Sequence, residues 1–521
     1  MDCHGWFDFA DLESPRLSAE GTHLLWRSAG VVWTAPVPPP SRIFRCTPER
    51  AWVGDAPCGP HPCPVATADG DLAWLPDGST IIALSESGQL TLYPLPSTSW
   101  QREVVSHGLW DAAPLSPTPS STSSPADATR LASAARLGFV AGAHVWLSAP
   151  ATPARWEPDV ATPASATVPE PPTSASADLF RHDLGVATRV LLYRNEDGLP
   201  ARWEPDVAWR GAQLFTLRES RLARPLMGIH PTTRDLVWVS PPGEFSMHAV
   251  APIDDDELLV VTNLHRIFAS VARFHVPSRT ARFLFDESWD QRAWLAGNRL
   301  LVLDNECGVD VARLYEWPSC RPVASVPPAG GSFGAFAFDA ARRRAVATWQ
   351  SPSRPPELVL LDLADASWRF LTANLPPPAP PVVPCRIRFA GLDGEPLWGW
   401  HFVALPAAPS RAPRAPRTDT TEHPPDAGSR TLAPLAIWHR EGSQERAVYR
   451  PQIQAALARG VSVLAPDPRG VTGYGLPYAR AHAAQDLEAA VRWALSEGRA
   501  SAIVELPAAS PSVPRSARDA Q

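Results

Sequence analysis

Short runs of β-forming residues separated by turn residues recur through the first two-thirds of the chain. In the clearest unit, 74–93, an aromatic run meets Pro76, Asp77 and Gly78, and β-branched and alternating runs follow on either side of Gly88. This order predicts consecutive antiparallel strands joined by tight turns. Related units recur at 14–21, 202–206, 229–239, 254–261, 294–303 and 336–349. Repeated units of this kind predict a β-propeller, with a β-sandwich plus extra hairpins as the alternative.

The proline content also favours a chain that is mainly β. The chain has 60 prolines in 521 residues, and one proline inside a helix destabilises it by about 3 kcal/mol. At roughly 150 residues per domain, this length predicts two or three domains, or one large repeat domain plus another. The hydrophobic content of 45% excludes a wholly disordered chain.

The charged residues exclude several classes of function. All 47 basic residues are arginines, so no lysine can form a Schiff base, act as a general base or bind phosphate. This excludes a P-loop and any pyridoxal-phosphate mechanism, and we expect no cofactor. A net charge of -7 provides no basic field for nucleic acid or an anionic membrane, so we expect neither as a partner.

The cysteines and the absence of targeting signals predict a cytoplasmic protein. The seven cysteines are odd in number and scattered along the chain, which favours reduced thiols. The first six residues lead into acidic positions without the basic start and apolar core of a signal peptide. No run of 18 apolar residues occurs, so we expect no membrane span.

Two clusters are weak candidates for metal sites. Cys58, His61 and Cys63 offer three zinc ligands, but a fourth is unspecified, and a loop with free thiols explains them better. The acidic run 254–257 is explained by an exposed turn before a strand as well as by a calcium site. We therefore expect no metal.

The pattern changes after about residue 432. An apolar run at 435–438 and a second one at 461–466 indicate buried strands, and helical spacing is found at 450–459 and 486–495. Strand, helix, strand, helix predicts an α/β domain with a parallel sheet. Three segments rich in Pro, Ala, Ser and Thr are predicted to be flexible insertions: 112–128, 149–176 and 404–429.

The most specific motif follows the second apolar run. An arginine-glycine pair, Arg469 and Gly470, precedes Gly473, Tyr474 and Gly475. With Tyr449-Arg450-Pro451 before it, this stretch resembles the prolyl oligopeptidase family of serine peptidases, in particular the acylaminoacyl-peptidases and dipeptidyl aminopeptidases. Weaker family-like segments are found at 14–18, 355–363, 371–372 and 389–394.

The resemblance implies a mainly β fold in two parts. Residues 1–375 would form an N-terminal β-propeller of seven or eight blades, and 376–521 the N-terminal part of an α/β-hydrolase domain. The family activity is serine-type hydrolysis of short peptides or of acylated or free N-termini, so a peptide is the expected partner. The oligomeric state stays open.

The catalytic residues of such a fold are not found where the family order requires them. A Gly-x-Ser-x-Gly elbow should follow the helix at 486–495, but Pro511 and Pro514 stand in that region and the chain stops at Gln521. The motif occurs only at 330–334, between two β-type runs, where a glycine-rich blade turn explains it. We therefore assign no catalytic residue.

The family's oxyanion motif, His-Gly-Gly-Pro, is altered as well. His439, Arg440, Glu441 and Gly442 stand in its place, and His439 matches a structural histidine rather than the base. Together these features predict an inactive peptidase, apparently truncated and degenerate at its C-terminus. The alternative is a non-catalytic propeller that binds a peptide or protein.

Overall fold

The computed structural model describes 12–37 and 202–374 with short gaps, the strands between 44 and 193, and 384–404, 434–439, 444–481, 485–497 and 502–504. The predicted insertions 112–128 and 149–176 lie outside the described residues, apart from the end of one strand at 149–150. The insertion 404–429 lies outside them after Ala404. A division at residue 375, which stays a prediction, falls in the undescribed stretch 375–383.

Four-stranded antiparallel sheets follow one another along the first half of the chain. The first two sheets contain β1 (Glu13–Leu17), β2 (His23–Ser28), β3 (Val31–Pro36) and β5 (His61–Pro62), then β6 (Asp71–Trp74), β7 (Thr80–Leu84), β8 (Gln89–Pro94) and β9 (Val105–Gly108). The next two contain β10 (Arg136–Ala141), β11 (His144–Pro150), β12 (Ala177–Asp183) and β13 (Thr188–Tyr193), then β14 (Arg202–Trp209), β15 (Ala212–Arg218), β16 (Leu226–Ile229) and β17 (Leu236–Trp238).

The same arrangement continues to the end of the propeller. Two more four-stranded sheets contain β18 (Met247–Pro252), β19 (Glu257–Thr262), β20 (Ser270–His275) and β21 (Thr280–Phe283), then β22 (Gln291–Ala296), β23 (Arg299–Glu306), β24 (Val309–Glu316) and β25 (Pro322–Val326). A five-stranded sheet contains β26 (Ser332–Phe333), β27 (Ala337–Phe338), β28 (Arg344–Ser351), β29 (Arg354–Asp362) and β30 (Ser367–Phe370).

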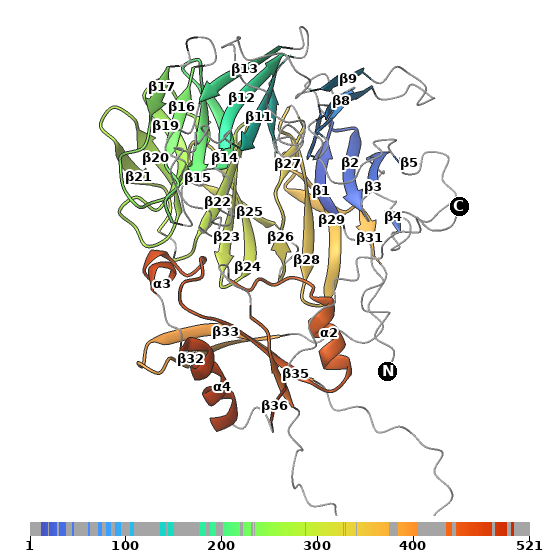
Figure 1. Cartoon of the computed structure of the whole chain (residues 1–521), viewed down its shortest axis with the longest axis vertical. Helices are drawn as coiled ribbons and strands as arrows, with labels where there is room; N and C mark the ends of the chain where they lie inside the picture. The colour runs from blue at the N-terminus through green and yellow to red at the C-terminus, as the bar shows by residue number, and fades with distance from the viewer. Residues whose placement is uncertain are drawn as a thin grey trace, which may run out of the picture.

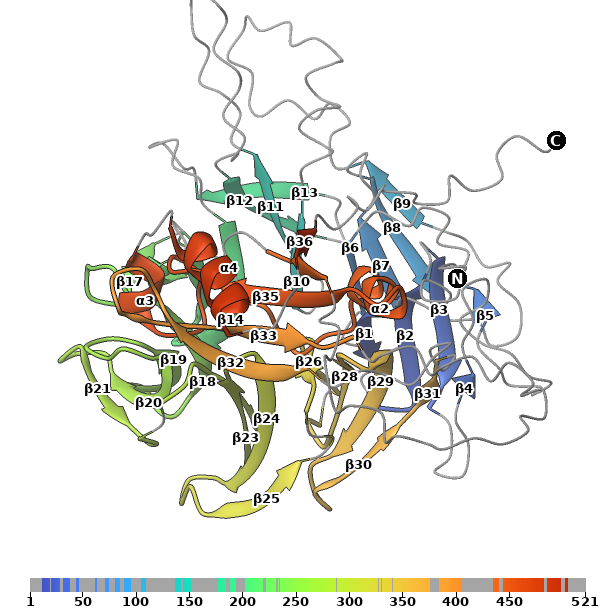
Figure 2. The ribbon, with the colours of Figure 1, turned by 90° about the horizontal axis from the view of Figure 1, so that it is seen from below.

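These sheets are the blades of a β-propeller, and Figure 2 shows them arranged around a common axis. The strand–turn–strand unit predicted at 74–93 is confirmed, because β6, β7 and β8 pair antiparallel. The ring closes where β31 (Thr372–Ala373) pairs in parallel with β4 (Phe44–Arg45). Buried Trp26 and Leu358 also share one core cluster, so the first and last sheets pack together. The exact number of blades stays a prediction.

The C-terminal part is an α/β domain with one five-stranded sheet, which lies below the propeller in Figure 1. Its strands, in spatial order, are β32 (Cys385–Ala390), β33 (Pro396–Phe402), β35 (Ser462–Asp467), β34 (Leu435–Ile437) and β36 (Ile503–Val504). Its helices are α2 (Pro451–Ala458), α3 (Leu476–Arg480) and α4 (Asp486–Ser496). The parallel pairing predicted for the strands at 435–438 and 461–466 is confirmed, because β34 is parallel to β35 and also to β36. The preceding strand, β33, is antiparallel to β32 and to β35.

The two longer helices cover opposite faces of this sheet. Ile453 of α2 packs in one cluster with Val463, whereas Ala490 of α4 packs in another with Leu464. Val463 and Leu464 are neighbours on β35, and successive side chains of a strand point to opposite faces. The side chains of β35 therefore pack alternately against the helix on each face of the sheet. The apolar run at 461–466 predicted that this strand is buried.

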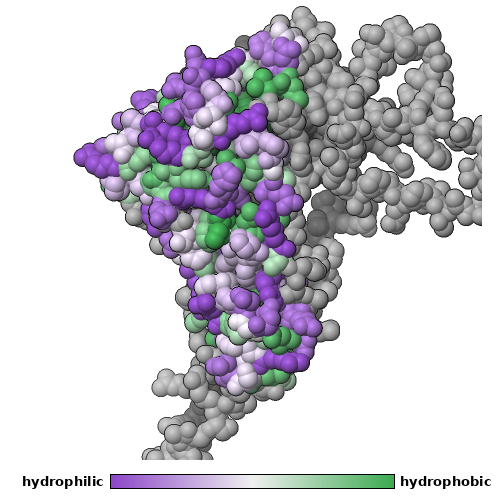
Figure 3. Space-filling model, turned by 90° about the vertical axis from the view of Figure 1, so that its left-hand side faces the viewer, coloured by the Kyte–Doolittle hydropathy of each residue, from purple (hydrophilic) through white to green (hydrophobic). Residues whose placement is uncertain are grey.

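Figure 3 shows a wide propeller part above a narrower α/β part, with hydrophilic and hydrophobic residues interspersed over this face. Within the described residues, no helix is long and apolar enough to cross a membrane.

Candidate functional site

A cavity of about 530 Å³ lies between the propeller and the α/β domain. The propeller contributes residues around β15, β18 to β20 and β22 to its wall, and the α/β domain contributes Gln444, Arg446 and part of 472–479. Arg224, Asp290 and Arg292 are the charged propeller residues that line it. Since neither part encloses the cavity alone, its shape depends on how the two parts dock.

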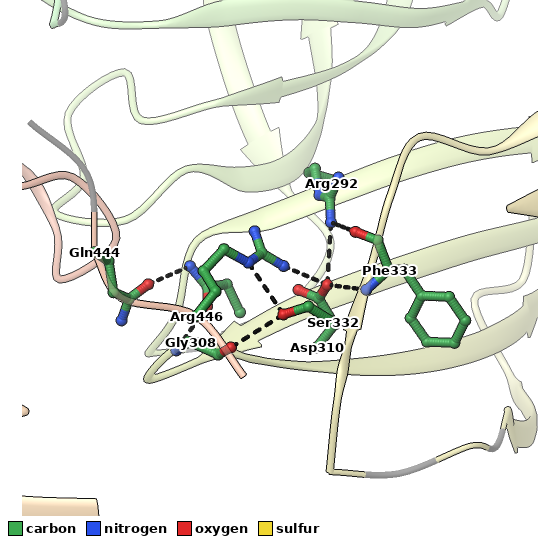
Figure 4. A network of polar contacts seen from close by, with 8 residues as sticks. Arg292, Gly308, Asp310, Ser332, Phe333, Gln444 and Arg446 are labelled. Carbon is green, nitrogen blue, oxygen red and sulfur yellow. Dashed lines mark hydrogen bonds and ion pairs between the residues drawn. The ribbon is translucent and has the colours of Figure 1, made fainter. Parts of the chain in front are cut away.

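Asp310 on β24 is the centre of a polar network beside this cavity, as Figure 4 shows. Its Oδ2 atom accepts hydrogen bonds from the backbone N–H of Phe333 at 2.7 Å and from Arg292 Nη2 at 3.2 Å. Arg446 Nη2 of the α/β domain donates to the same oxygen. The Asp310 side chain is only 1% exposed, so one buried carboxylate joins two blades and the α/β domain.

Ser332 belongs to the only Gly-x-Ser-x-Gly sequence of the chain, and the structure places it in the same network. Its hydroxyl donates to the carbonyl of Gly308 at 3.2 Å and accepts from Arg446 Nε at 3.2 Å. It lies on β26, which pairs directly with β28. The motif is thus followed by strands and not by a helix, as its sequence context predicts, and Ser332 has a structural role between blades.

The turn between β23 and β24 makes a direct backbone contact with the α/β domain. The carbonyl of Gly308 accepts a hydrogen bond from Ala447 N at 2.7 Å. Gly308 has a φ of +86°, and a Cβ atom there would stand 2.4 Å from the carbonyl oxygen of Glu445. Asn305 of the same turn region donates from Nδ2 to Gln444 Oε1 at 2.8 Å. Glycine is therefore required at 308 for docking.

Gly473 and Gly475 of the 469–475 motif line the cavity and allow close contacts there. Gly473 has a φ of +111°, and a Cβ atom there would lie 2.3 Å from Gln444 Oε1. Gly475 has a φ of +85°, and its Cβ atom would lie 2.4 Å from the Ile267 side chain of the propeller. Leu476 N donates to the carbonyl of Ile267 at 2.8 Å. Gly475 therefore lets the segment approach the propeller closely, whereas Gly473 lets it pack against Gln444 within the α/β domain.

The arginine of the motif stabilises the α/β domain from within. Arg469 donates to Asp486 from Nη2 at 2.7 Å and from Nε at 3.0 Å, which is a bidentate pair with a carboxylate that is 1% exposed. Arg469 also pairs with Asp393 in the β32–β33 turn. Because bidentate arginine–carboxylate pairs fix geometry, Arg469 ties the loop after β35 to the start of α4.

Tyr474 connects the motif to a buried carboxylate at the end of β35. Its hydroxyl donates to Asp467 Oδ2 at 2.7 Å, and its ring stacks on Trp398 with centroids 5.9 Å apart. Asp467 Oδ1 accepts from Glu445 N at 2.7 Å. Burial nevertheless raises the pKa of Asp467 to about 7, and the nearby charge of Glu445 acts in the same direction.

We expect the Asp467→Asn variant to remove a pH dependence of stability. The folded-state pKa of Asp467 lies above the unfolded value of about 3.9, so the stabilising proton uptake is complete below that value and is lost as pH rises through about 7. The wild-type free energy of unfolding should therefore fall relative to the variant between about pH 4 and pH 7, by at most about 1.4 kcal/mol per pH unit. Urea denaturation over this range measures the difference.

A second carboxylate supplies the control for this experiment. The hydrogen bond from Arg469 lowers the pKa of Asp393, so the stability that Asp393 contributes is lost as pH falls. The difference between wild type and Asp393→Asn should consequently change with pH in the opposite sense. A wild-type to Asp467→Asn difference that is constant from pH 4 to pH 7 would contradict the assignment.

The predicted oxyanion remnant is only partly described by the structure. His439 follows β34 and is exposed, while Arg440, Glu441 and Gly442 lie outside the described residues. The network around Asp310, Arg292 and Arg446 was missed by sequence reasoning. Arg292 and Asp310 lie on different strands of one blade and Arg446 lies in the α/β domain, and none of them stands in a motif that could have linked them.

The acidic run 254–257 forms a capped turn, as the simpler explanation predicts. Asp254 Oδ1 accepts from Asp256 N at 2.8 Å and from Glu257 N at 2.7 Å, and Asp256 pairs with Arg210. Among the described residues, no group of three or more His, Cys, Asp or Glu is arranged to hold a metal ion. Cys58 and Cys63 lie outside the described residues.

Comparisons with known proteins identify the fold. No protein-family model and no curated protein matches the chain, but solved structures do. One is a mutant of prolyl oligopeptidase B from Galerina marginata bound to a 35mer hydrolysis and macrocyclization substrate, with 12% identity, a TM-score of 0.66 and coverage of 96% of this chain and 69% of that chain. Another is a puromycin-hydrolyzing peptidase from Mycobacterium tuberculosis, with 15% identity, a TM-score of 0.64 and coverage of 95% and 73%.

A third match, an acylaminoacyl peptidase from Pyrococcus horikoshii, has 12% identity and a TM-score of 0.56, with coverage of 94% of this chain and 72% of that chain. The class of protein that the two parts define is a β-propeller joined to an α/β-hydrolase sheet. The chain has the fold of the prolyl oligopeptidase family, as its motif at 469–475 predicts.

Proposed function

We propose that the protein binds short peptides in the cavity between its propeller and its α/β-hydrolase domain, without cleaving them. The cavity itself carries this proposal. Its volume of about 530 Å³ lies in the range of small-ligand sites. Asn263 and Gln444 line its wall, and their side-chain amide nitrogens, which donate no hydrogen bond within the described residues, can donate to a peptide backbone. The similar mutant of the Galerina marginata enzyme was solved with a 35mer hydrolysis and macrocyclization substrate bound.

Three observations support binding without cleavage. Ser332, in the only Gly-x-Ser-x-Gly sequence, lies on a propeller strand and is bonded to Gly308 and Arg446. Pro511 stands in the region where the family elbow is expected, and a proline disfavours the helix that would follow. Arg440 and Glu441 replace glycines of the oxyanion motif.

Serine-type peptide hydrolysis is the second candidate function. The fold favours it, because the similar structures include enzymes described as a prolyl oligopeptidase, a puromycin-hydrolyzing peptidase and an acylaminoacyl peptidase. A fluorophosphonate probe, which labels activated serines, separates the two candidates. We expect no labelling of this chain alongside a labelled serine peptidase as the positive control. A labelled serine would favour hydrolysis.

Filling part of the cavity should weaken peptide binding. Ala479 lines the cavity from α3, so an Ala479→Trp side chain would occupy part of the space that a ligand needs. We expect isothermal titration with short peptides to show saturable binding to the wild-type chain and at least about a tenfold loss for Ala479→Trp, which corresponds to about 1.4 kcal/mol.

Ala481→Trp is the matched control, because Ala481 follows the same helix but does not line the cavity. It should bind peptides as the wild type does. Equal affinities for wild type and Ala479→Trp would show that peptides bind elsewhere, and no binding to any chain would refute the proposal.

A further inference from the structure

Two guanidinium groups share one carboxylate oxygen at the wall of the cavity. Arg292 Nη2 lies 3.2 Å from Asp310 Oδ2, and Arg446 Nη2 contacts the same atom (Figure 4). Both arginines line the cavity, whereas Asp310 does not. Arginine keeps its charge in proteins, so two positive charges face one negative charge, and a net positive charge is left at the cavity wall.

Both arginines keep hydrogen-bond donors that are not used within the described part of the chain. Arg292 donates only from Nη2, to Asp310 and to the carbonyl of Phe333, so its Nε and Nη1 atoms are not engaged there. Arg446 uses Nε and Nη2, which leaves Nη1. The side chains are 40% and 29% exposed. A ligand in the cavity can therefore reach donors of both groups.

The neighbourhood of these donors favours a negative ligand. Desolvation lowers the pKa of Arg292; the charge of Asp310 opposes this effect, and the charge of Arg446 adds to it. A second anion would relieve the repulsion between the two cations. Arg224 is a third arginine on the wall. The one lining carboxylate is Asp290, whose Oδ1 accepts from Ala269 N at 2.9 Å and whose pKa is raised by burial.

We infer that the cavity selects peptides that carry a carboxylate, which binds between Arg292 and Arg446. This inference rests on the proposed peptide-binding function. A carboxylate accepts two parallel hydrogen bonds from guanidinium groups. Its negative charge would neutralise the positive charge of the two arginines that Asp310 leaves uncompensated. The carboxylate comes either from the C-terminus of the peptide or from an acidic side chain, and both sources present the same group to the arginines.

Three N-acetylated tetrapeptides distinguish these sources by isothermal titration with the full chain. The first is tetra-alanine with a free C-terminal carboxylate, the second is its C-terminal amide, and the third is the amide with glutamate as its last residue. We expect the amide of tetra-alanine to bind at least about tenfold more weakly than a carboxylate peptide, because it loses charge-assisted hydrogen bonds. If only the first peptide binds tightly, the site recognises the C-terminal carboxylate. If the third peptide also binds tightly, the site accepts the carboxylate of an acidic side chain as well.

The arginines are tested with a charge-matched control. Arg292→Gln should reduce the ratio of affinities for the free acid and the amide towards one, with little change for the amide. Arg321→Gln removes an arginine from the same blade that pairs with Glu316 on the surface, where it is 72% exposed, and should keep the wild-type ratio. Arg446→Gln provides a second variant if Arg292→Gln does not fold.

The outcomes separate this inference from the function on which it rests. Equal affinities for all three peptides would overturn the carboxylate preference and leave peptide binding in place. An unchanged ratio in the folded Arg292→Gln and Arg446→Gln variants would overturn the assignment to these residues. No binding of any peptide would overturn the proposed function and the inference together.

Discussion

Replacing Asp310 with alanine is expected to lower the free energy of unfolding by about 3–5 kcal/mol, the usual effect of breaking a buried ion pair by removing one partner. The carboxylate is buried and pairs with Arg292 and Arg446 at once. Its removal leaves two neighbouring guanidinium groups without their counter-ion and deprives Phe333 N of its acceptor. Denaturant unfolding followed by tryptophan fluorescence measures the change.

A surface carboxylate provides the control for this prediction. Asp256 also pairs with an arginine, Arg210, but both side chains are about half exposed, at 55% and 48%. Exposed pairs contribute about 0–1 kcal/mol, so Asp256→Ala should have little effect. Asp310→Asn, which keeps an acceptor for Phe333 N, should lie between. Equal losses for Asp310→Ala and Asp256→Ala would contradict the central role of Asp310.

Replacing Gly308 with alanine is expected to separate the α/β domain from the propeller. The left-handed backbone alone disfavours alanine by about 1–2 kcal/mol. In addition, the new Cβ atom would stand 2.4 Å from the carbonyl oxygen of Glu445, and both are held by the hydrogen bond from Ala447 N to Gly308. Backbone cannot yield as a flexible side chain does, so the contact must open. Stability and peptide affinity should both fall, because both parts line the cavity.

A Gly297→Ala variant separates the effect of the left-handed backbone from the effect of the contact with Glu445. Gly297 lies in the preceding turn of the same sheet, between β22 and β23, with a φ of +61°, and a Cβ atom there meets nothing within 4 Å. Gly297→Ala should therefore show the backbone effect alone, with peptide affinity unchanged. Limited proteolysis should expose new sites between the two parts only in Gly308→Ala. Identical behaviour of the two variants would refute the docking role of Gly308.

Local patterns of residues predicted much of the fold. The strands around Gly88, the helix at 486–495 and the buried strand at 461–466 all follow from turn chemistry and from the spacing of apolar residues over a few positions. The parallel pair of β34 and β35 was also predicted, but the antiparallel pairing of β33 with β35 was not, because these strands are more than sixty positions apart in the chain. Strand direction depends on such distant partners, and periodicity does not report them.

The candidate site was likewise predicted only in those parts whose residues are close together in sequence. The motif at 469–475 was recognised because its residues are close in sequence, although the reason for Gly475, a close approach to Ile267, appears only in the folded chain. Arg446 and Asp310 are 136 positions apart, and neither is unusual in its own segment. No local signal marks a pair of this kind.

The sequence by itself determined the repeated antiparallel strands with their tight turns and the two-part order of the chain, because these depend on interactions between near neighbours. Only the tertiary structure decided that Ser332 joins a network between blades and that Asp310 is shared by two arginines of different parts. The physical reason is that Asp310 and Arg446 come into contact only when the propeller has closed and docked on the α/β domain. Residues so far apart in sequence leave no local pattern that predicts their contact.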